Sequence, residues 1–435
     1  MPEKRVVVVG AGLAGSEVSL RLARAGVRVD LFEMRDKKLT EAHRTGWFAE
    51  LVCSNSLGSE EIGSGKGLLK EELRILGSAL LPIADATQVP AGKALAVDRE
   101  LFAKGVTEAV RSRPEIRIIN EEATVIPDAP VVVLACGPLA TAPLASAIRS
   151  LIGDEDFYFY DAISPIVDAG SIDESVGYAA DRYEDSVGDY LNLPMDRERY
   201  AAFLGALLSA KTTPLRDFEA PRYFERCMPV EEIARRGPET LLFGPLRPVG
   251  LPDPRTGKIP HAVVQLRKEN REGAMYNLVG FQTRMTWPEQ KKVFSLIPGL
   301  ENADFLRYGS VHRNSFIDAR GRLTPWMEMQ DRPGLFFAGQ ITGVEGYVES
   351  IASGLVAGAA ALDRAFNRTP RSFPPESIIG ALMAHITTPG SGTPQPMNAN
   401  YGLLPEVLIR RKRDRKERKA QVALEAVKKF AALHS

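Results

Sequence analysis

The feature that most constrains the fold is a strand, a glycine turn and a helix close to the start of the chain. The segment RVVVVGAGLAGSEVSLRLARAGVRVDLFEMR opens with an apolar run typical of a buried strand and continues with Gly10, Gly12 and Gly15. An amphipathic helix pattern follows, and then a second strand that ends at Glu33. This order of elements predicts a parallel βαβ unit that binds a dinucleotide.

Each residue type in this turn has a distinct expected role. The first glycine permits the tight turn, the second lets the backbone approach a pyrophosphate, and the third lets the helix pack against the strand. The helix N-terminus then faces the phosphates, and the acidic residue accepts a hydrogen bond from a ribose 2′-hydroxyl. The expected dinucleotide-binding residues are Gly10, Ala11, Gly12, Leu13, Ala14, Gly15 and Glu33.

A second glycine-rich segment, GLFFAGQITGVEGYVESIASGLVAGAAAL at 334–362, lies near the other end of the chain. It resembles the closing motif of glutathione-reductase-like FAD domains, in which a late helix points its N-terminus at the flavin. This resemblance implies FAD and adds Gly339, Gln340, Gly346 and Tyr347 to the expected cofactor-binding residues, although Gln340 stands where that superfamily often has Asp. VVVLACGPLA resembles the superfamily's strand-and-turn motif, with Cys136 expected to be a small buried residue beside the cofactor.

Length and composition bound the remaining possibilities. A chain of 435 residues is too long for one ordinary core, and equal numbers of basic and acidic residues (55 each) predict no general affinity for nucleic acid. The three cysteines are far apart and show no metal-ligand spacing, so we expect no metal site and a reducing cytoplasm. No apolar run is long enough for a membrane span, and the first strand leaves no room for a signal peptide.

We therefore expect an α/β protein with a glutathione-reductase-like split FAD-binding Rossmann domain and an inserted α+β domain. The middle of the chain, rich in Tyr, Pro and Arg, carries no second GxGxxG motif, so a separate NAD(P)H domain is not expected. The expected divisions are 1–140 for the first part of the FAD-binding domain, 141–305 for the inserted substrate domain, 306–405 for the closing part and 406–435 for a basic C-terminal helix.

The C-terminal segment holds eight basic residues between Arg410 and Lys419. Such a run fits either the solvated face of a helix or a contact with RNA phosphates. The sequence leaves both interpretations open.

A series of short motifs between about residue 4 and about residue 405 together resembles one family. They are GAGLAGSE, FAELVCSNSL, KGLLKEEL, VPAGKALAVDRE, YLNLPM, CMPVEE, RGPETLLFGPLRPVGL, PHAVVQLRKEN, LVGFQT, WPEQ, IPGLENA, YGSVHRNSF and GVEGYVES. The family is that of the folate- and FAD-dependent tRNA (uracil-5-)-methyltransferases. The resemblance implies methylation of the T-loop uridine at tRNA position 54, with 5,10-methylenetetrahydrofolate as the one-carbon donor and reduced FAD as the hydride source. It also implies NADPH or NADH as reductant, tRNA as partner, and neither a membrane nor a stable protein partner.

The same resemblance places two catalytic cysteines, Cys53 in VCSNS and Cys227 in CMPVEE. Carbon 5 of uracil is a poor nucleophile until a thiolate adds at carbon 6, so this chemistry needs a cysteine. His312 in YGSVHRNSF is a candidate folate-binding residue, because a planar ring suits stacking on a pteridine, although a lone histidine also suits a core.

Three other functions fit parts of the pattern. The same chemistry on a ribosomal RNA uridine would leave the sequence unchanged. A flavoprotein that modifies the wobble uridine of tRNA shares similar motifs, but such proteins are longer at the C-terminus. A flavin- and RNA-binding factor without turnover would have no use for two cysteines at these motifs.

Overall fold

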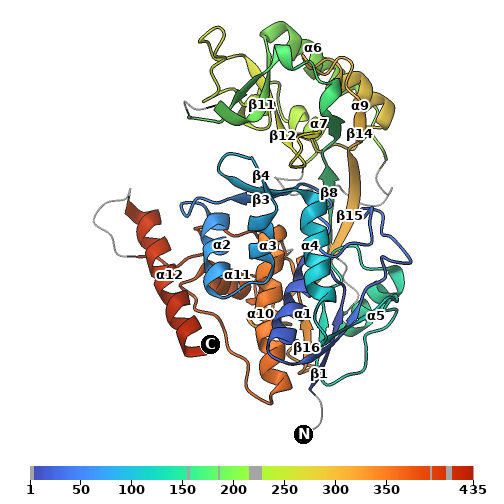
Figure 1. Ribbon diagram of the computed structural model, residues 1–435, viewed down its shortest axis with the longest axis vertical. Helices are drawn as coiled ribbons and strands as arrows, with labels where there is room; N and C mark the ends of the chain where they lie inside the picture. The colour runs from blue at the N-terminus through green and yellow to red at the C-terminus, as the bar shows by residue number, and fades with distance from the viewer. Residues whose placement is uncertain are drawn as a thin grey trace.

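The computed structural model describes residues 4–153, 157–184, 187–214, 228–391, 394–407 and 414–434. Two bodies are visible in Figure 1, and both chain termini lie on the lower one. We call the lower body the large domain, and the upper body, residues 164–309, the insert domain.

The large domain is built on a parallel sheet. Its strands, in spatial order, are β16 (Leu335–Phe337), β7 (Val132–Leu134), β1 (Arg5–Val9), β2 (Arg28–Phe32) and β6 (Ile116–Ile119). Side chains alternate across the sheet, so Val6 and Val8 pack on one face and Val7 and Val9 on the other. Because helices cover both faces, the strand VVVV is apolar at every position.

Helices from distant parts of the chain cover the first face. α1 (Leu13–Arg24) packs against α10 (Tyr347–Ala365), and the two helices approach closely at Gly354, where an added Cβ would lie 2.6 Å from the carbonyl oxygen of Ala14. The other helices of this domain are α2 (Gly65–Ile75), α3 (Leu80–Ala86), α4 (Arg99–Arg111), α5 (Ala142–Ile152), α11 (Ile378–Thr387) and α12 (Arg415–His434), with the short 3-10 turn η3 (Gln340–Thr342). A small antiparallel sheet consists of β3 (Ser56–Ser59), β5 (Ala94–Val97) and β4 (Gln88–Val89).

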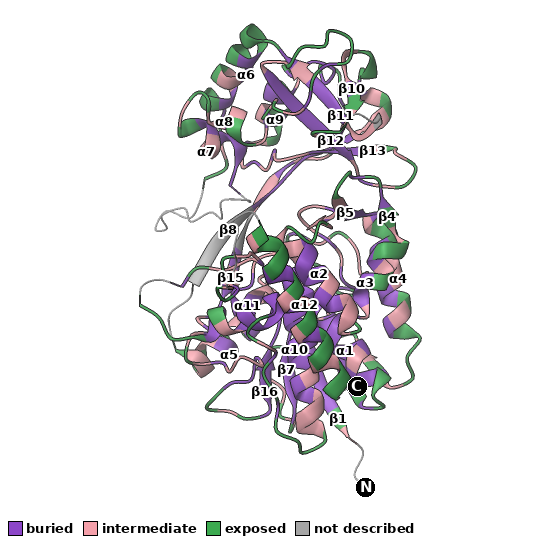
Figure 2. Cartoon of the chain, turned by 90° about the vertical axis from the view of Figure 1, so that its left-hand side faces the viewer, coloured by how far each residue is buried: buried purple, intermediate pink, exposed green. Residues whose placement is uncertain are grey.

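The insert domain has its own sheet and its own core. Its antiparallel strands, in order, are β10 (Tyr178–Ala180), β11 (Val187–Met195), β12 (Ala262–Lys268), β13 (Met275–Leu278), β9 (Ile166–Asp168) and β14 (Phe305–Arg307). Its helices are η1 (Ala169–Ser171), η2 (Glu174–Val176), α6 (Arg197–Ser209), α7 (Val230–Arg235), α8 (Thr240–Phe243) and α9 (Trp287–Phe294). Strand β12 and the second half of β11 are largely buried in the core of this domain (Figure 2).

A two-stranded ribbon joins the two domains. β8 (Phe157–Ile163) leaves the large domain and β15 (Ser310–Phe316) returns to it, and the two pair in antiparallel register (Figure 1). The insert therefore begins later than the expected boundary at residue 141. The reason is α5, whose Leu144 and Ile148 pack against the second face of the parallel sheet and so belong to the large domain.

The C-terminal helix α12 is docked on the large domain. Its buried residues Ala420 and Ala423 join the main core, and the rings of Phe430 and Phe373 are 4.7 Å apart. Residues 408–413, which hold four of the eight basic residues of the tail, lie outside the described part of the chain. Among the described residues, no helix combines the length and the apolar composition that crossing a membrane requires.

Candidate cofactor and thiol site

The glycine turn before α1 has three different local geometries. Gly10 has a positive φ of 97°, and a Cβ there would lie 2.5 Å from the carbonyl oxygen of Ala135. A Cβ on Gly15 would lie 1.8 Å from the carbonyl oxygen of Gly10, so the helix can sit this close to the turn only with glycine at this position. A Cβ on Gly12 would meet no atom within 4 Å. The turn therefore leaves open space at the N-terminus of α1, where backbone N–H groups favour an anion.

A pocket of about 1230 Å³, partly open to solvent, lies in front of this turn. Of the residues expected from the sequence, Gly10, Gly12, Leu13, Ala14, Glu33, Gly339, Gln340 and Tyr347 line it. Ala11 and Gly15 are buried behind the turn, and Gly346 is the N-cap of α10 with a φ of 121°. Cys136 also lines the pocket; it is half-buried rather than buried as expected, and desolvation raises the pKa of its thiol to about 12, as suits an unreactive thiol.

Glu33, at the end of β2, is held by four hydrogen bonds. It accepts from the Ala11 backbone N–H at 2.8 Å, and from Arg35 through its backbone N–H at 3.0 Å, Nε at 2.9 Å and Nη2 at 2.7 Å. Burial alone would raise the pKa of Glu33, but the hydrogen bonds and charge of Arg35 outweigh it and the pKa is lowered. Glu33 is therefore ionised, and a ribose hydroxyl would have to share its carboxylate oxygens with Arg35.

Arg35 is a pocket residue that the sequence analysis did not identify. Its side chain is 5% exposed, and Nη1 is buried with no hydrogen-bond partner among the residues that the structure describes. An unmade hydrogen bond of this kind costs about 1–3 kcal/mol. The pocket thus presents a donor for an acceptor atom of a ligand. The only signal in the sequence is the position of Arg35, two residues after Glu33.

The loop that carries Cys53 forms the wall of the pocket beside α10. Tyr347, the first residue of α10, accepts hydrogen bonds through Oη from the backbone N–H of Cys53 at 2.8 Å and of Ser54 at 3.1 Å. The Cys53 thiol is 3.7 Å from the carbonyl oxygen of Ala162 on β8. Burial, followed by the electrostatic interaction with Cys53, raises the pKa of Tyr347, so the phenol is neutral and keeps its own proton to donate.

The insert domain fixes this loop directly through Arg267 and indirectly through Arg99 of the large domain. Arg267 of β12 donates from Nε to Oδ1 of Asn55 at 2.9 Å and from Nη2 to Oγ of Ser54 at 2.9 Å. Arg99, the first residue of α4, donates to Glu269 from Nη2 at 2.9 Å and to the carbonyl oxygen of Leu51 from Nη1. The motifs VCSNS, AVDRE and QLRKEN, which are far apart in sequence, thus meet at one place.

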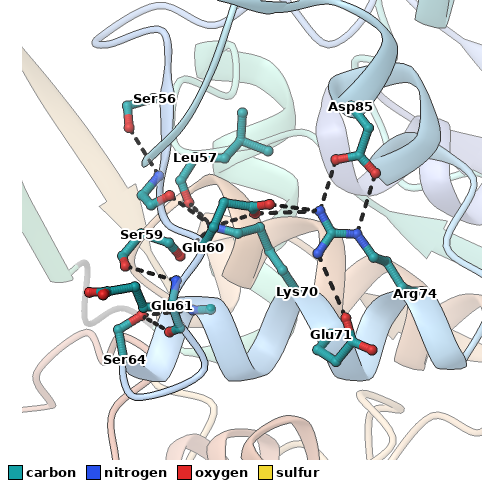
Figure 3. Close-up of polar contacts among 12 residues, drawn as sticks. Ser56, Leu57, Ser59, Glu60, Glu61, Ser64, Lys70, Glu71, Arg74 and Asp85 are labelled. Carbon is teal, nitrogen blue, oxygen red and sulfur yellow. Dashed lines mark hydrogen bonds and ion pairs between the residues drawn. The ribbon is translucent and has the colours of Figure 1, made fainter. Parts of the chain in front are cut away.

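Lys70 fixes the strand that follows the same loop. Its ammonium group is fully buried and donates to three successive carbonyl oxygens, those of Leu57 at 3.1 Å, Gly58 at 2.8 Å and Ser59 at 2.7 Å (Figure 3). Burial lowers the pKa of Lys70 to about 8. All three ammonium donors are used by the backbone, so Lys70 acts as a clamp on β3 rather than as a ligand-binding group.

Two further charged or titratable side chains face the site. His43 lines the pocket, and burial, followed by the positive charge of Arg35, lowers its pKa to about 4, so the ring is neutral at physiological pH. Arg307 of β14 interacts electrostatically with Cys53 and Tyr347. Both residues were missed from sequence, where neither stands in a recognisable cofactor motif.

The remaining expected site residues cannot be placed in the same way. Cys227 lies outside the described residues; the chain is described again from Met228, which is buried in the insert domain. The backbone of His312 is paired with that of Asp161 on the ribbon between domains, and its side chain is not described. Asn314, two positions further along, is buried and lines the pocket. Among the described residues, no His, Cys, Asp and Glu side chains gather in a way that could hold a metal ion.

Comparison with known proteins identifies what the chain is similar to. Residues 5–369 match the family described as Glucose inhibited division protein A. Proteins named Methylenetetrahydrofolate--tRNA-(uracil-5-)-methyltransferase TrmFO are 54% identical in Heliobacterium modesticaldum, over 98% of this chain and 98% of the relative, and 53% identical in Geobacter sulfurreducens, over 96% and 97%. The relative from Desulforudis audaxviator, with the same name, is 53% identical over 98% of this chain and 97% of its own.

The solved structure of Aquifex aeolicus GidA superposes on 99% of this chain and 74% of its own, with a TM-score of 0.71 and 19% identity. At this identity the likeness concerns the fold. It confirms the predicted fold class, a split glutathione-reductase-like FAD-binding Rossmann domain with an insertion.

Proposed function

The chain belongs to the family of methylenetetrahydrofolate–tRNA-(uracil-5-)-methyltransferases and to the Glucose inhibited division protein A family. From this membership we propose that it methylates carbon 5 of the T-loop uridine at position 54 of tRNA. The one-carbon unit comes from 5,10-methylenetetrahydrofolate. The observation that carries the proposal is identity above one half over nearly the whole length of relatives with this name. The position of Cys53 supports it, because Cys53 follows the pocket residue Val52 and its backbone N–H donates to Tyr347, which also lines the pocket.

The pocket fits FAD by its own chemistry. The open space at Gly12 and the N-terminus of α1 suit a pyrophosphate, and the unpartnered Nη1 of Arg35 suits an acceptor on the adenosine half. Gln340 and Tyr347 line the pocket at the closing segment, where the flavin half is proposed to bind. When bound and reduced, FAD supplies the hydride that completes the methyl group, with NADPH or NADH as the external source of electrons.

Cys227 is the proposed nucleophile. Its thiolate bonds to carbon 6 of uracil, and the π electrons of the C5=C6 bond move toward carbon 5 and the carbonyl oxygen at carbon 4. Carbon 5 can then bond to the one-carbon unit. Loss of the carbon 5 proton and of the folate nitrogen leaves an exocyclic methylene. Expulsion of Cys227 restores the C5=C6 double bond once the methyl group is complete.

Cys53 is the proposed proton acceptor at carbon 5. Its loop is held on three sides, by Tyr347 from α10, by Arg267 through Ser54, and by Arg99 through Leu51. A side chain held in this way loses little conformational freedom when the substrate binds, which lowers the barrier to proton transfer. The insert domain provides one of these contacts directly, through Arg267, and its Glu269 also binds Arg99, so movement of that domain would change the position of the thiol.

The experiment that tests the function combines two assays. Purified protein is incubated with an unmodified tRNA transcript, NADPH and methylenetetrahydrofolate labelled in its one-carbon unit, and the digested RNA is analysed by mass spectrometry. We expect labelled 5-methyluridine in the T-loop fragment. The second assay is mass spectrometry of the nucleosides of tRNA and ribosomal RNA from cells that lack the gene. We expect 5-methyluridine to be missing from the tRNA.

Different results would point elsewhere. Label incorporated from S-adenosylmethionine by the pure protein would overturn the proposed donor. Loss of 5-methyluridine from ribosomal RNA alone would keep the chemistry and change the substrate. Loss of a wobble-uridine modification, with 5-methyluridine unchanged, would favour the wobble-uridine enzyme.

A further inference from the structure

We propose that Trp287, Arg307 and Tyr308 of the insert domain bind an unpaired stretch of the RNA substrate beside Cys53, with Arg307 on a backbone phosphate and Trp287 stacked on a base. We call these three residues the strand contact. The inference rests on the proposed function in that the substrate is RNA. Helix α9 and strand β14, which carry the strand contact, lie along the same edge of the insert domain (Figure 1).

Arg307 is a charged group without a counter-charge. The guanidinium has no hydrogen-bond or ion-pair partner among the described residues, and its Nε is completely buried. Burial, followed by the positive charges of Arg99 and Arg44, lowers the pKa of Arg307 to about 10, so it is still protonated at neutral pH. Desolvating a cation without pairing it is costly, and this cost is removed if an anion of the substrate binds there.

Two acidic residues that contact Arg99 and Arg44 have other partners, although Oε1 of Glu269 is buried without a hydrogen bond among the described residues. Glu269 binds Arg99, and Glu50 accepts hydrogen bonds from the backbone of Arg44 and from the backbone and hydroxyl of Thr45. Arg307 therefore supplies a positive charge that interacts with Cys53 and has no described counter-charge, which leaves its partner to come from outside. A guanidinium is well suited to a phosphate, because its planar donors can bind two oxygens at once.

Trp287 supplies the second, independent observation. Its side chain is 62% exposed, yet its ring is stacked on that of Tyr308 with centroids 5.5 Å apart and 14° between the planes. Tyr308 in turn stacks on Phe305 at 5.2 Å and 11°, and Phe305 contacts the core ring of Phe294. The stack of Tyr308 and Phe305 therefore holds the exposed ring of Trp287 in a fixed orientation. A rigid exposed aromatic face is what proteins present to unstacked RNA bases.

The two observations concern adjacent positions. Arg307 and Tyr308 are neighbours in the chain, so their Cα atoms are about 3.8 Å apart, and one interacts with Cys53 while the other supports the exposed tryptophan. Folate also combines carboxylates with planar rings, so the experiment below separates it from RNA through the KM for methylenetetrahydrofolate. Single-stranded RNA offers a phosphate and a planar base within one nucleotide, and a basic group next to an aromatic face is the usual way to bind it.

The test measures affinity for an unmodified tRNA transcript by fluorescence anisotropy at several salt concentrations. Trp287→Ala should weaken binding about 5- to 100-fold, whereas Trp287→Phe, which keeps a stacking face, should lose much less. Arg307→Gln should weaken binding and reduce the slope of log affinity against log salt by about one, and Arg307→Lys should restore the slope. Phe243→Ala, an 80% exposed ring elsewhere in the insert domain, is the matched control and should bind like the wild type.

FAD content from the visible spectrum and the KM for methylenetetrahydrofolate are measured on the same proteins, and both should be unchanged. Unaltered RNA affinity in Trp287→Ala would overturn the inference. So would an Arg307→Gln protein whose folate KM rises while its RNA affinity and salt slope stay the same, since the anion would then be the folate carboxylate. If the wild-type protein neither binds nor methylates tRNA, it is the proposed function that fails.

Discussion

The phenol oxygen of Tyr347 accepts the backbone N–H of Cys53 at 2.8 Å, although 294 positions separate the two residues. One residue opens the helix that closes the pocket, and the other belongs to the loop after β2. The hydrogen bond therefore couples the proposed flavin-binding helix to the proposed proton-transfer thiol. A substitution at Tyr347 should therefore change the position of Cys53.

Tyr347→Phe should lower the methylation rate by up to about 10²-fold, because the N–H groups of Cys53 and Ser54 lose their acceptor while the ring is retained. FAD content should be close to that of the wild type. Single-turnover methylation and the rate at which Cys53 reacts with iodoacetamide give the measurements. If the variant methylates tRNA and reacts with iodoacetamide at the wild-type rates, the hydrogen bond does not position the loop.

Replacing the two cysteines should separate their roles. Cys227→Ala should abolish both methylation and the covalent trapping of 5-fluorouracil-containing tRNA, because fluorine at carbon 5 blocks the elimination that normally frees the nucleophile. Cys53→Ala should be about 10²- to 10⁴-fold slower and still bind FAD. Denaturing gels of the RNA–protein adduct provide the measurement. Trapping that survives in Cys227→Ala and disappears in Cys53→Ala would mean that the two roles are reversed.

Arg35→Met should weaken FAD binding and make the protein less stable at neutral pH, since Glu33 would be left buried without its counter-charge. In the wild type the pKa of Glu33 is lower in the folded than in the unfolded state, so its stabilising contribution is present above the unfolded pKa, about 4.3. It is lost as the pH falls through the folded value. Retention of FAD on a desalting column between pH 3 and pH 8 checks this, and wild-type retention by Arg35→Met would contradict it.

Lys70 gives a pH dependence of the same sign in a higher pH range. Its pKa is lowered to about 8 in the folded protein, against about 10.4 when unfolded, so between these values the unfolded chain binds more protons. Stability should therefore rise with pH across this window, relative to the Lys70→Met variant. That variant should be destabilised by about 2–4 kcal/mol at pH 7, because one buried and two partly buried carbonyl groups lose their donor. Urea denaturation at pH 7 and pH 9.5 supplies both measurements, with the surface variant Lys104→Met as the control; a Lys70→Met protein as stable as that control would exclude the clamp.

Local features of the sequence predicted the large domain, but contacts between residues far apart in the sequence could not be predicted. The roles of Gly10 and Gly15 could be derived because they depend on neighbours within a few residues or on one adjacent strand. Arg99 and Glu269 are 170 positions apart and could be paired only once the insert domain was in place. Helix α5 was assigned to the insert on composition, whereas its apolar face, with Leu144, decides its position. The unpartnered atom of Arg35 is visible only in three dimensions.

The basic tail offers a last prediction, which the packing of α12 sharpens. Lys419 is 6% exposed and donates to the carbonyl oxygens of Leu404 at 2.9 Å and Tyr401 at 3.4 Å, so it has a structural role. Lys416 and Arg418 are exposed on the same helix. If the tail contacts RNA phosphates, the double variant Lys416→Gln/Arg418→Gln should weaken tRNA binding and reduce the salt slope by up to about two, with an unchanged melting temperature.

Lys419→Met should do the reverse, lowering the melting temperature because one buried and one partly buried carbonyl group lose a donor, with no change in the salt slope. Point substitutions are preferable to truncation here, since removing α12 would expose the core residues Ala420 and Ala423 and their neighbours. Equal affinity and equal salt slope in the double variant and the wild type would establish the alternative, a solvated helix face. A loss of affinity confined to the double variant would add a second RNA contact, on the large domain, to the strand contact on the insert domain.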